Sequence, residues 1–165
     1  ENLKKLSKTL SFNKIKNLNI IEAAASSSNS VINFHVDKYS GLSHIQPKDP
    51  YKNQISSKKE TIKIKTFQID DLDLDENTLI KIDVEGHEME VLKGMKRTLE
   101  LQKIRLIMIE LYDDYLKRYN SSFAEVDFYL NKYGYYRLKE QVINKKLVSF
   151  PIHNNYFYSY KKLRV

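Results

Sequence analysis

The stretch LIKIDVEGHEMEVLKGMKRTL, residues 79–99, decides the fold. It opens with an apolar run, interrupted only by Lys81, that predicts a short buried strand. Helical spacing begins after Gly86 and gives one face to Val91, Leu92, Met95, Thr98 and Leu99. The order is therefore strand, acidic turn and helix. Ligands of α/β proteins bind at the carboxyl ends of strands, and Asp83 and Glu85 lie at this one.

A second apolar run, Ile104–Glu110, follows that helix and predicts a second buried strand. Two strands joined by a helix form a crossover unit, so we expect them to be parallel neighbours. Their carboxyl ends then bring Asp83, Glu85 and Glu110 to one rim of the sheet. His87 stands beside that rim, where the helix begins.

This acidic rim has two interpretations. Clustered carboxylates bind divalent metal ions, orient a substrate hydroxyl or accept a proton. His87 could share the last role, because the ordinary pKa of histidine lies near neutrality. Alternatively, Asp83 and Glu85 only cap the following helix and pair with lysines. The residue pattern leaves both interpretations open.

The N-terminal part predicts one helix and three strands. Leucines at i, i+3 and i+7 give residues 1–13 an amphipathic helical face. Leu18–Ala25 predicts a strand whose small terminal residues either let a flat ligand or a second backbone approach or simply fit a tight turn. Residues 31–36 and 61–69 predict two more strands, antiparallel to each other. Residues 39–57, with one glycine and two prolines, predict a long surface loop.

The C-terminal part predicts one helix and two strands. Ser122 is expected to cap the helix, with Glu125 three residues later completing a capping box, and Gly134 is expected to end it. Tyr135–Glu140 and Asn155–Tyr160 predict strands joined by a polar connection.

Length and composition set the broad class. The 165 residues suffice for one domain with a real core, and no apolar run approaches the ~20 residues of a membrane span. The chain lacks cysteine, which fits a reducing compartment, so we expect a cytoplasmic location. We interpret the net charge of +7 as a solvated lysine surface and expect no nucleic-acid partner, because no basic stretch is dense. The oligomeric state is left open.

The acidic run DDLDLDE, residues 70–76, suggests a calcium loop at first sight. Asp71, Asp73 and Asp75 have the alternate spacing of EF-hand ligands. However, an EF-hand loop requires glycine at the position that Glu76 occupies. We therefore interpret the run as a solvated acidic turn that leads into the central strand.

Residues 79–99 closely resemble the signature of FkbM-type methyltransferases, which use S-adenosylmethionine. The family's strand runs roughly iKiDvEG and its helix E-x-x-v-L-k-G, and these elements match residues 80–86 and 88–94. Weaker matches lie on both sides, at residues 24–26, 41–43, 66–72 and 108–110. The resemblance covers nearly the whole chain.

The resemblance implies an α/β fold, the Rossmann-like sheet of class I methyltransferases. By that template, residues 1–13 are the second helix and Leu18–Ala25 is the third strand. Leu79–Asp83 and Ile104–Glu110 are the fourth and fifth strands, and the last two strands form an antiparallel pair at one edge. Residues 31–69 form an insertion that carries a β-hairpin.

One departure from the template concerns the cofactor. The first βαβ unit, with its glycine-rich loop and the acidic residue that holds the ribose, has no counterpart, since the chain has four glycines and no G-x-G. We therefore expect residues 1–165 to be a single methyltransferase-domain fragment, the C-terminal portion of a longer protein. We also expect a gap in the middle of the sheet and poor binding of S-adenosylmethionine by this chain alone.

For the intact protein the resemblance implies O-methylation of a sugar, glycolipid or natural-product hydroxyl. Asp83 would lie beside the methyl donor and the acceptor, with Glu85, His87 and Glu110 as further catalytic candidates. A divalent metal could assist them. The candidates for contact with the cofactor are Ala24, Ala25, Ser26 and Asp83.

Two alternatives compete with this function. A truncated or degenerate methyltransferase-like domain could serve as a non-catalytic binding module. An RNA methyltransferase would use the basic charge, although the usual acceptor-base motifs of that class are lacking. We expect a small-molecule or carbohydrate acceptor as the partner.

Overall fold

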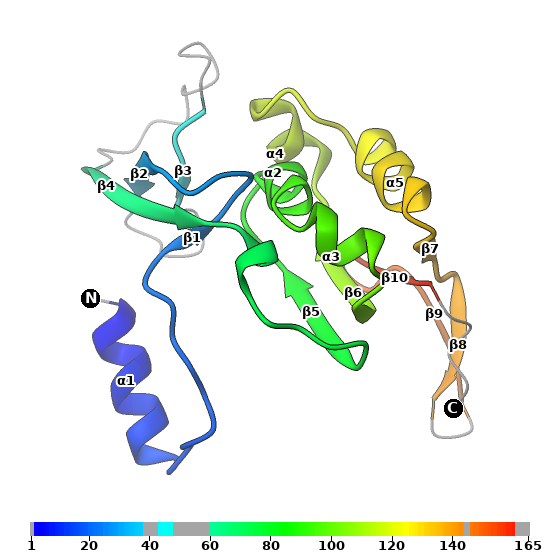
Figure 1. The fold of residues 1–165 in the computed structure, drawn as a ribbon, viewed down its shortest axis with the longest axis horizontal. Coiled ribbons are helices and arrows are strands. Elements are labelled where there is room, and N and C mark those ends of the chain that lie inside the picture. Colours follow the sequence, from blue (N-terminus) through cyan, green and yellow to red (C-terminus); the bar gives the residue numbers. More distant parts are fainter. Residues whose placement is uncertain (1, 38–42, 48–59, 144–145, 161–165) are drawn as a thin grey trace.

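The computed structural model describes residues 2–37, 43–47, 60–143 and 146–160. Over these residues the fold is mixed α/β, with two four-stranded sheets, a separate two-stranded hairpin and five α-helices. The two larger sheets lie on opposite sides of the acidic turn that follows β5 (Figure 1). Their mutual position therefore determines what surrounds the predicted site.

The first large sheet has the strand order β5-β6-β10-β7. Its strands are β5 (Thr78–Ile82), β6 (Ile104–Glu110), β10 (Asn155–Ser159) and β7 (Tyr136–Arg137). β5 and β6 are parallel, with Ile82 opposite Ile109, and β10 is antiparallel to both of its neighbours. The predicted crossover unit and the antiparallel pair at one edge are thus confirmed.

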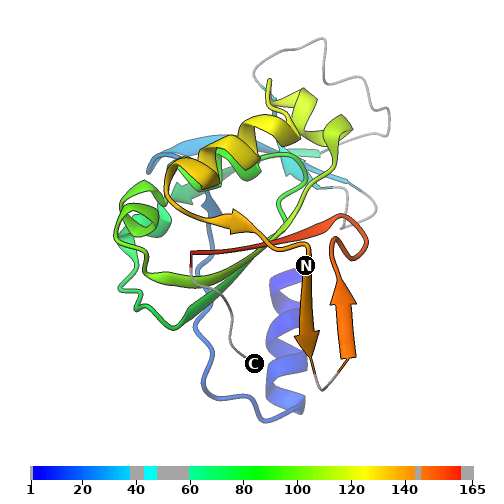
Figure 2. The same cartoon turned by 90° about the vertical axis from the view of Figure 1, so that its right-hand side faces the viewer.

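Four helices cover one face of this sheet (Figure 2). They are α2 (Glu88–Lys93), α3 (Lys96–Glu100), α4 (Asp113–Arg118) and α5 (Phe123–Lys132). The other face is more open. Leu79 on β5 exposes 66% of its surface, so this apolar run is buried on one face only. The side chains with no exposed surface between helices and sheet include Leu92, Met95, Leu99, Ile107, Ile109, Leu116, Val126 and Leu130.

The helix expected after β5 is interrupted at Gly94. A Cβ atom on Gly94 would lie 2.0 Å from the carbonyl oxygen of Ser26, so this backbone packs directly against the loop after β1. Asp70, in the 3-10 helix Ile69–Asp71, donates its N–H to the Gly94 carbonyl and accepts the N–H of Thr98 at 2.8 Å. These contacts end α2 and begin α3. The predicted apolar face stays buried at Val91, Leu92, Met95, Thr98 and Leu99.

The second large sheet has the order β1-β4-β2-β3. Its strands are β1 (Ala24–Ala25), β4 (Glu60–Phe67), β2 (Val31–Val36) and β3 (His44–Ile45). The antiparallel pairing expected for β2 and β4 is confirmed. The long loop expected over residues 39–57 is wrong at His44 and Ile45, which are buried and pair with β2. Residues 38–42 and 48–59 lie outside the described residues.

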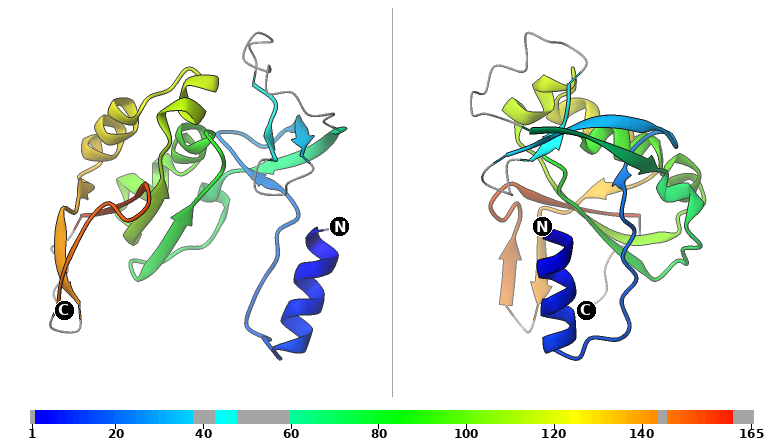
Figure 3. Two further views of the ribbon diagram at one scale, coloured as in Figure 1. Left: turned by 180° about the vertical axis from the view of Figure 1, so that it is seen from behind. Right: turned by 90° about the vertical axis from the view of Figure 1, so that its left-hand side faces the viewer.

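The strand predicted over Leu18–Ala25 is largely wrong, since only Ala24 and Ala25 pair, in parallel with β4. No neighbouring strand among the described residues offers backbone partners to residues 18–23, so no ladder forms there. The preceding helix, α1 (Asn2–Phe12), is confirmed but stands apart from the body of the molecule (Figure 3). Exposed apolar side chains mark this whole segment, at Leu3, Leu6, Phe12, Ile15, Leu18, Ile20 and Ile21.

In the C-terminal part the capping box of α5 is confirmed. Ser122 accepts the N–H of Glu125 and donates its hydroxyl to the same side chain at 3.1 Å. The strand predicted over Tyr135–Glu140 is shorter, and the hairpin of β8 (Glu140–Ile143) and β9 (Lys146–Ser149) intervenes before β10. Within the part of the chain that the structure describes, no helix is long and apolar enough to cross a membrane.

Candidate active site

The turn between β5 and α2 adopts a left-handed backbone. Glu85 has φ 55° and Gly86 has φ 104°, a region that residues with a side chain rarely adopt. A Cβ atom on Gly86 would lie 2.4 Å from the carbonyl oxygen of Tyr115 in α4, so only glycine fits this approach. The turn connects β5 to α2 and leaves the Glu85 side chain at the rim of the sheet.

Glu88 stabilises this turn by accepting hydrogen bonds from its backbone. It exposes 2% of its surface, and its Oε1 accepts the backbone N–H of Gly86 at 3.1 Å and of Val84 at 3.3 Å. Its Oε2 is buried and has no hydrogen-bond partner among the described residues. Burial raises the pKa of Glu88, whereas the backbone hydrogen bonds act in the opposite direction. Glu88 is therefore a structural acid of the turn.

Asp83 and Glu110 are side by side at the carboxyl ends of β5 and β6, as the parallel register requires. Their carboxyl groups hydrogen-bond to each other, and Lys81 donates to Asp83. The Lys81 hydrogen bond lowers the pKa of Asp83, while burial and then the Asp83 hydrogen bond raise the pKa of Glu110. The two shifts are opposite in sign, so Asp83 is the stronger acid of the pair and Glu110 the weaker one.

Of the acids at the rim, Glu85 has the most strongly shifted pKa. Burial, then the negative charges of Asp83 and Glu110, raises the pKa of Glu85 to about 7, and the Arg118 guanidinium opposes this shift. A carboxyl group with a pKa near the working pH is well matched to accept a proton and pass it on. Perturbed acids of this kind concentrate at functional sites.

His87 lies on the other side of the turn and is buried. Its Nε2 is 3.0 Å from the hydroxyl of Ser26, and its ring meets Tyr119 edge-on with centroids 5.3 Å apart. The Tyr119 hydroxyl in turn donates to the carbonyl of Ile45 on β3. His87 thus joins the two large sheets instead of pointing at the carboxylates.

A cavity of about 420 Å³ opens at the rim. Four of the predicted residues, Ala24, Ala25, Asp83 and Glu85, line it together. The cavity also reaches β2 and β3 of the second sheet through Phe34, Ser43, His44 and Ile45. Two of the predicted cofactor residues and two of the predicted catalytic acids therefore line one cavity, although they come from different sheets.

Ser26 and His87 line a second cavity, of about 670 Å³, on the far side of Ile45. Glu110 is absent from the walls of both cavities and contacts the first only through Asp83. The predicted site is thus divided: two acids and two alanines face the smaller cavity, while Ser26 and His87 face the larger.

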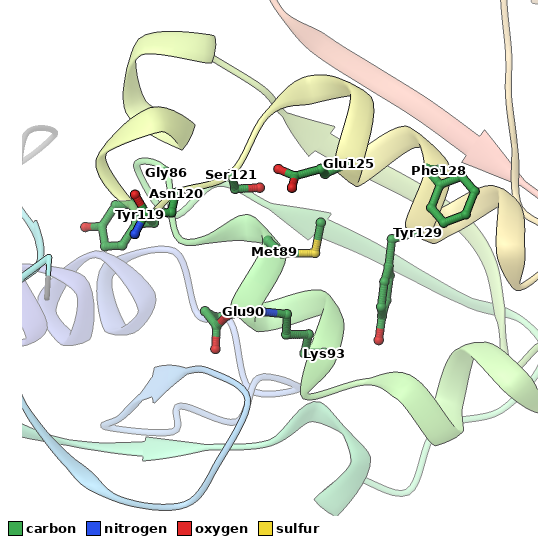
Figure 4. Close-up of a pocket in the computed structure, with 10 residues that line it drawn as sticks. All are labelled: Gly86, Met89, Glu90, Lys93, Tyr119, Asn120, Ser121, Glu125, Phe128 and Tyr129. Atoms are coloured by element: carbon green, nitrogen blue, oxygen red, sulfur yellow. Dashed lines mark hydrogen bonds and ion pairs between the residues drawn. The ribbon is translucent and has the colours of Figure 1, made fainter. Parts of the chain in front are cut away.

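A third cavity, of about 280 Å³, lies between α2 and α5 (Figure 4). Met89, Phe128 and Tyr129 give it an apolar end, and Lys93 forms an ion pair with Glu90 at 2.5 Å on its wall. It shares Glu90, Tyr119 and Asn120 with the second cavity.

The residues do not fit a metal site. Among the described residues, no group of three or more histidine, aspartate or glutamate side chains is arranged to hold a metal ion. Lys81 already forms an ion pair with Asp83 and so offsets part of the negative charge that a cation would otherwise balance. The expected divalent metal therefore gains no support from the rim.

Three features of the candidate site were not predicted from the sequence. α4 carries Arg118 and Tyr119 to the cavities, but its six residues are too few to show a periodic pattern. His44 reaches the rim on a two-residue strand inside an expected loop. The third feature is the left-handed turn at Glu85. It alone of the three had a signal in the sequence, which is the glycine after Glu85.

Comparisons with known proteins define the class. A family model described as the methyltransferase FkbM domain matches residues 2–136, which is most of the chain. The chain belongs to the FkbM methyltransferase domain family, as the resemblance of residues 79–99 predicted. None of the curated proteins compared with it matches.

A solved structure agrees at the level of the fold. The crystal structure of a methyltransferase FkbM from Methylobacillus flagellatus KT is similar, with a TM-score of 0.56 and 18% sequence identity. The similarity covers 96% of this chain and 34% of that chain. The present chain therefore spans about a third of that protein's length.

Proposed function

We propose that this chain is part of an S-adenosylmethionine-dependent enzyme that methylates a hydroxyl group of a sugar, glycolipid or natural product. The observation that carries the proposal is the rim where Asp83 and Glu85 face Ala24 and Ala25 across one cavity. Family membership suggests methyl transfer, and the rim offers a proton acceptor for a hydroxyl. This combination favours the enzyme over a non-catalytic module and gives no role to RNA.

The cavity fits one side of the proposed cofactor. Small side chains at Ala24 and Ala25 leave room for a flat ring, and the Asp83 carboxylate can accept hydrogen bonds from hydroxyl or amino groups. A volume of about 420 Å³ lies within the usual range of ~300–1,000 Å³ for small-molecule sites. When bound, S-adenosylmethionine supplies an electrophilic methyl group.

The protein's own residues then have two tasks, to orient the acceptor oxygen and to remove its proton. We assign the removal of the acceptor's proton to Glu85, because its pKa of about 7 suits a general base at neutral pH. Asp83 and Glu110 hold negative charge beside Glu85 and so raise its pKa. Ser26 and His87 fix the loop after β1 against α2 and so position the alanines.

We further assign the two large sheets to one Rossmann-like class I sheet, with residues 1–165 as a single domain. Two observations support this: β1 and β5 are both edge strands among the described residues, and each has a parallel partner on its other side. An edge strand with a parallel partner is open to a further parallel strand. The gap expected in the middle of the sheet agrees with this assignment.

The test is Glu85→Gln in the methyltransferase that contains this chain. Glutamine keeps the size of the side chain and cannot accept the proton, so kcat should fall about 10²–10⁴-fold. Methyl transfer to a panel of sugar and natural-product hydroxyls is measured by mass spectrometry. Glu76→Gln, at an exposed acid outside the rim, is the matched control. Full activity of Glu85→Gln would remove Glu85 from the mechanism.

A further inference from the structure

The second cavity is larger and more polar than the one at the rim. The loop after β1, the second large sheet and the end of α4 contribute to its walls. Its volume of about 670 Å³ is sufficient for a small-molecule ligand. It lies against Ile45 and the Ser26–His87 pair, which also bound the rim. A molecule in this cavity would thus be a neighbour of the rim.

Hydroxyl and amide groups dominate the walls. The loop after β1 contributes four serines. Asn33 of β2 and Gln46, directly after β3, contribute amides that hydrogen-bond to each other at 2.9 Å. Three of the serine hydroxyls already bond to His87, Glu90 and Thr66, whereas the amides carry further N–H groups that can donate to oxygen atoms of a ligand. The serines on the wall are Ser26, Ser27, Ser28 and Ser30.

The charges on the walls do not cancel. Glu90 is the one carboxylate among the described lining residues, and Lys93 and the Ser27 hydroxyl each approach it to 2.5 Å. These two contacts lower the pKa of Glu90 against the opposing effect of burial and offset its negative charge. Figure 4 shows Lys93 extending towards Glu90 on the surface of α2.

Arg118 is the cation that remains. It is half-buried, and its guanidinium lies over the ring of Tyr115, with Cζ 4.2 Å from the ring centroid. It forms no ion pair with any carboxylate in the described part of the chain. The stacking contact fixes the plane of the guanidinium, and a guanidinium fixed in this way binds carboxylate or phosphate oxygens in pairs.

We propose that the second cavity binds the acceptor of methyl transfer through an oxyanion group, held by Arg118 and by amide N–H groups of the walls. Phosphate esters and carboxylates share this chemistry. The identity of the ligand as the methyl acceptor rests on the proposed function. The oxyanion site itself follows from the walls of the cavity alone. Arg118 also lies close enough to Glu85 to lower its pKa, so the oxyanion site and the rim are neighbours.

The test is a titration of the 165-residue chain with inorganic phosphate, followed by backbone NMR at constant ionic strength. We expect shifts concentrated at residues 26–30 and 118–120. Arg118→Gln should weaken phosphate binding about tenfold or more, because a charged hydrogen-bond donor is lost. Arg118→Lys should retain part of the affinity, since lysine keeps the charge without the fork. Acetate in a parallel titration distinguishes carboxylate from phosphate recognition.

Lys117→Gln is the matched control, because Lys117 is exposed on the same helix and outside the cavity. Equal affinity of the Arg118→Gln and Lys117→Gln variants, or shifts spread over the surface lysines, would overturn the proposal. Tighter binding of glucose than of phosphate would overturn it too. No methyl donor is present, so a negative result here is distinct from loss of the proposed activity, and the Glu85→Gln assay does not bear on it.

Discussion

At the scale of single residues, Glu85 combines backbone strain with unfavourable charge. Its left-handed φ of 55° and its position among other carboxylates both oppose folding. Features that oppose folding and persist at a site with suitable chemistry are typical of residues retained for function. Glu85 is thus the residue for which stability and activity should respond in opposite directions.

We expect Glu85→Asn to stabilise the fold by about 1 kcal/mol, because asparagine tolerates the left-handed region and carries no charge. The same variant should lose methyl transfer. Thermal unfolding measures the first effect, and Gly86→Ala serves as the opposite control, since its Cβ would collide with the Tyr115 carbonyl and lower the melting temperature. A lower melting temperature for Glu85→Asn would contradict the argument from strain.

The pKa of Glu85 also predicts how stability depends on pH. The folded state holds this proton up to about pH 7, whereas an unperturbed glutamate loses it near 4.5. Between these values the folded state binds this proton more strongly than the unfolded state, so the contribution of Glu85 to stability is greatest below pH 4.5 and falls as pH rises towards 7. In Glu85→Asn this fall should be smaller but still present, because Glu88 and Glu110 have pKa shifts of the same sign.

At the scale of elements, Asp70, the first residue of the acidic run before β5, has a structural role. The Asp70 carboxylate accepts the backbone N–H groups of Arg97 and Thr98 and the hydroxyl of Thr98, at 2.7–2.9 Å. These are free donors at the start of α3, which Asp70 caps from a distant part of the chain. The next carboxylate of the run, Asp71, instead accepts from Asn29 at 2.9 Å.

Asp70→Ala should therefore destabilise the chain by about 1–2 kcal/mol, the usual effect of losing a helix cap. Asp73→Ala, at an exposed aspartate three residues along the same run, should have almost no effect. Urea denaturation of the two variants makes the comparison under identical conditions. Equal destabilisation would mean that the run acts through its total charge and not through the cap.

At the scale of the whole molecule, the two large sheets are joined by a few close contacts across the site. The backbone of Gly94 touches the carbonyl of Ser26, Ser27 donates to Glu90, and Tyr119 donates to Ile45. These contacts bring the alanines of β1 to the acids of β5. The geometry of the proposed active site thus depends on how tightly the sheets are held together.

Gly94→Ala tests this dependence. Gly94 has helical φ and ψ, so alanine on its own would be favoured by about 1 kcal/mol at such a position. Here the added Cβ would lie 2.0 Å from the Ser26 oxygen, so the sheets must separate. We expect a lower melting temperature and faster amide hydrogen exchange in β1 and in the loop after it, with the core strand β6 less affected. A higher melting temperature would show that the contact is readily relieved.

The sequence by itself determined the parts that depend on neighbouring residues. The two parallel strands, the acidic rim and the capping box at Ser122 follow from local periodicity and spacing. The motif over residues 79–99 identified the family, which the family model then confirmed.

Only the tertiary structure decided what long-range contacts control. Gly94 ends a helix because a distant carbonyl touches it, and residues 18–23 form no strand because no described strand pairs with them. His87 bonds to Ser26 instead of joining the acids, and Arg118 reaches its cavity on a helix too short to show a pattern. Such contacts connect residues far apart in the chain, and local spacing carries no information about them.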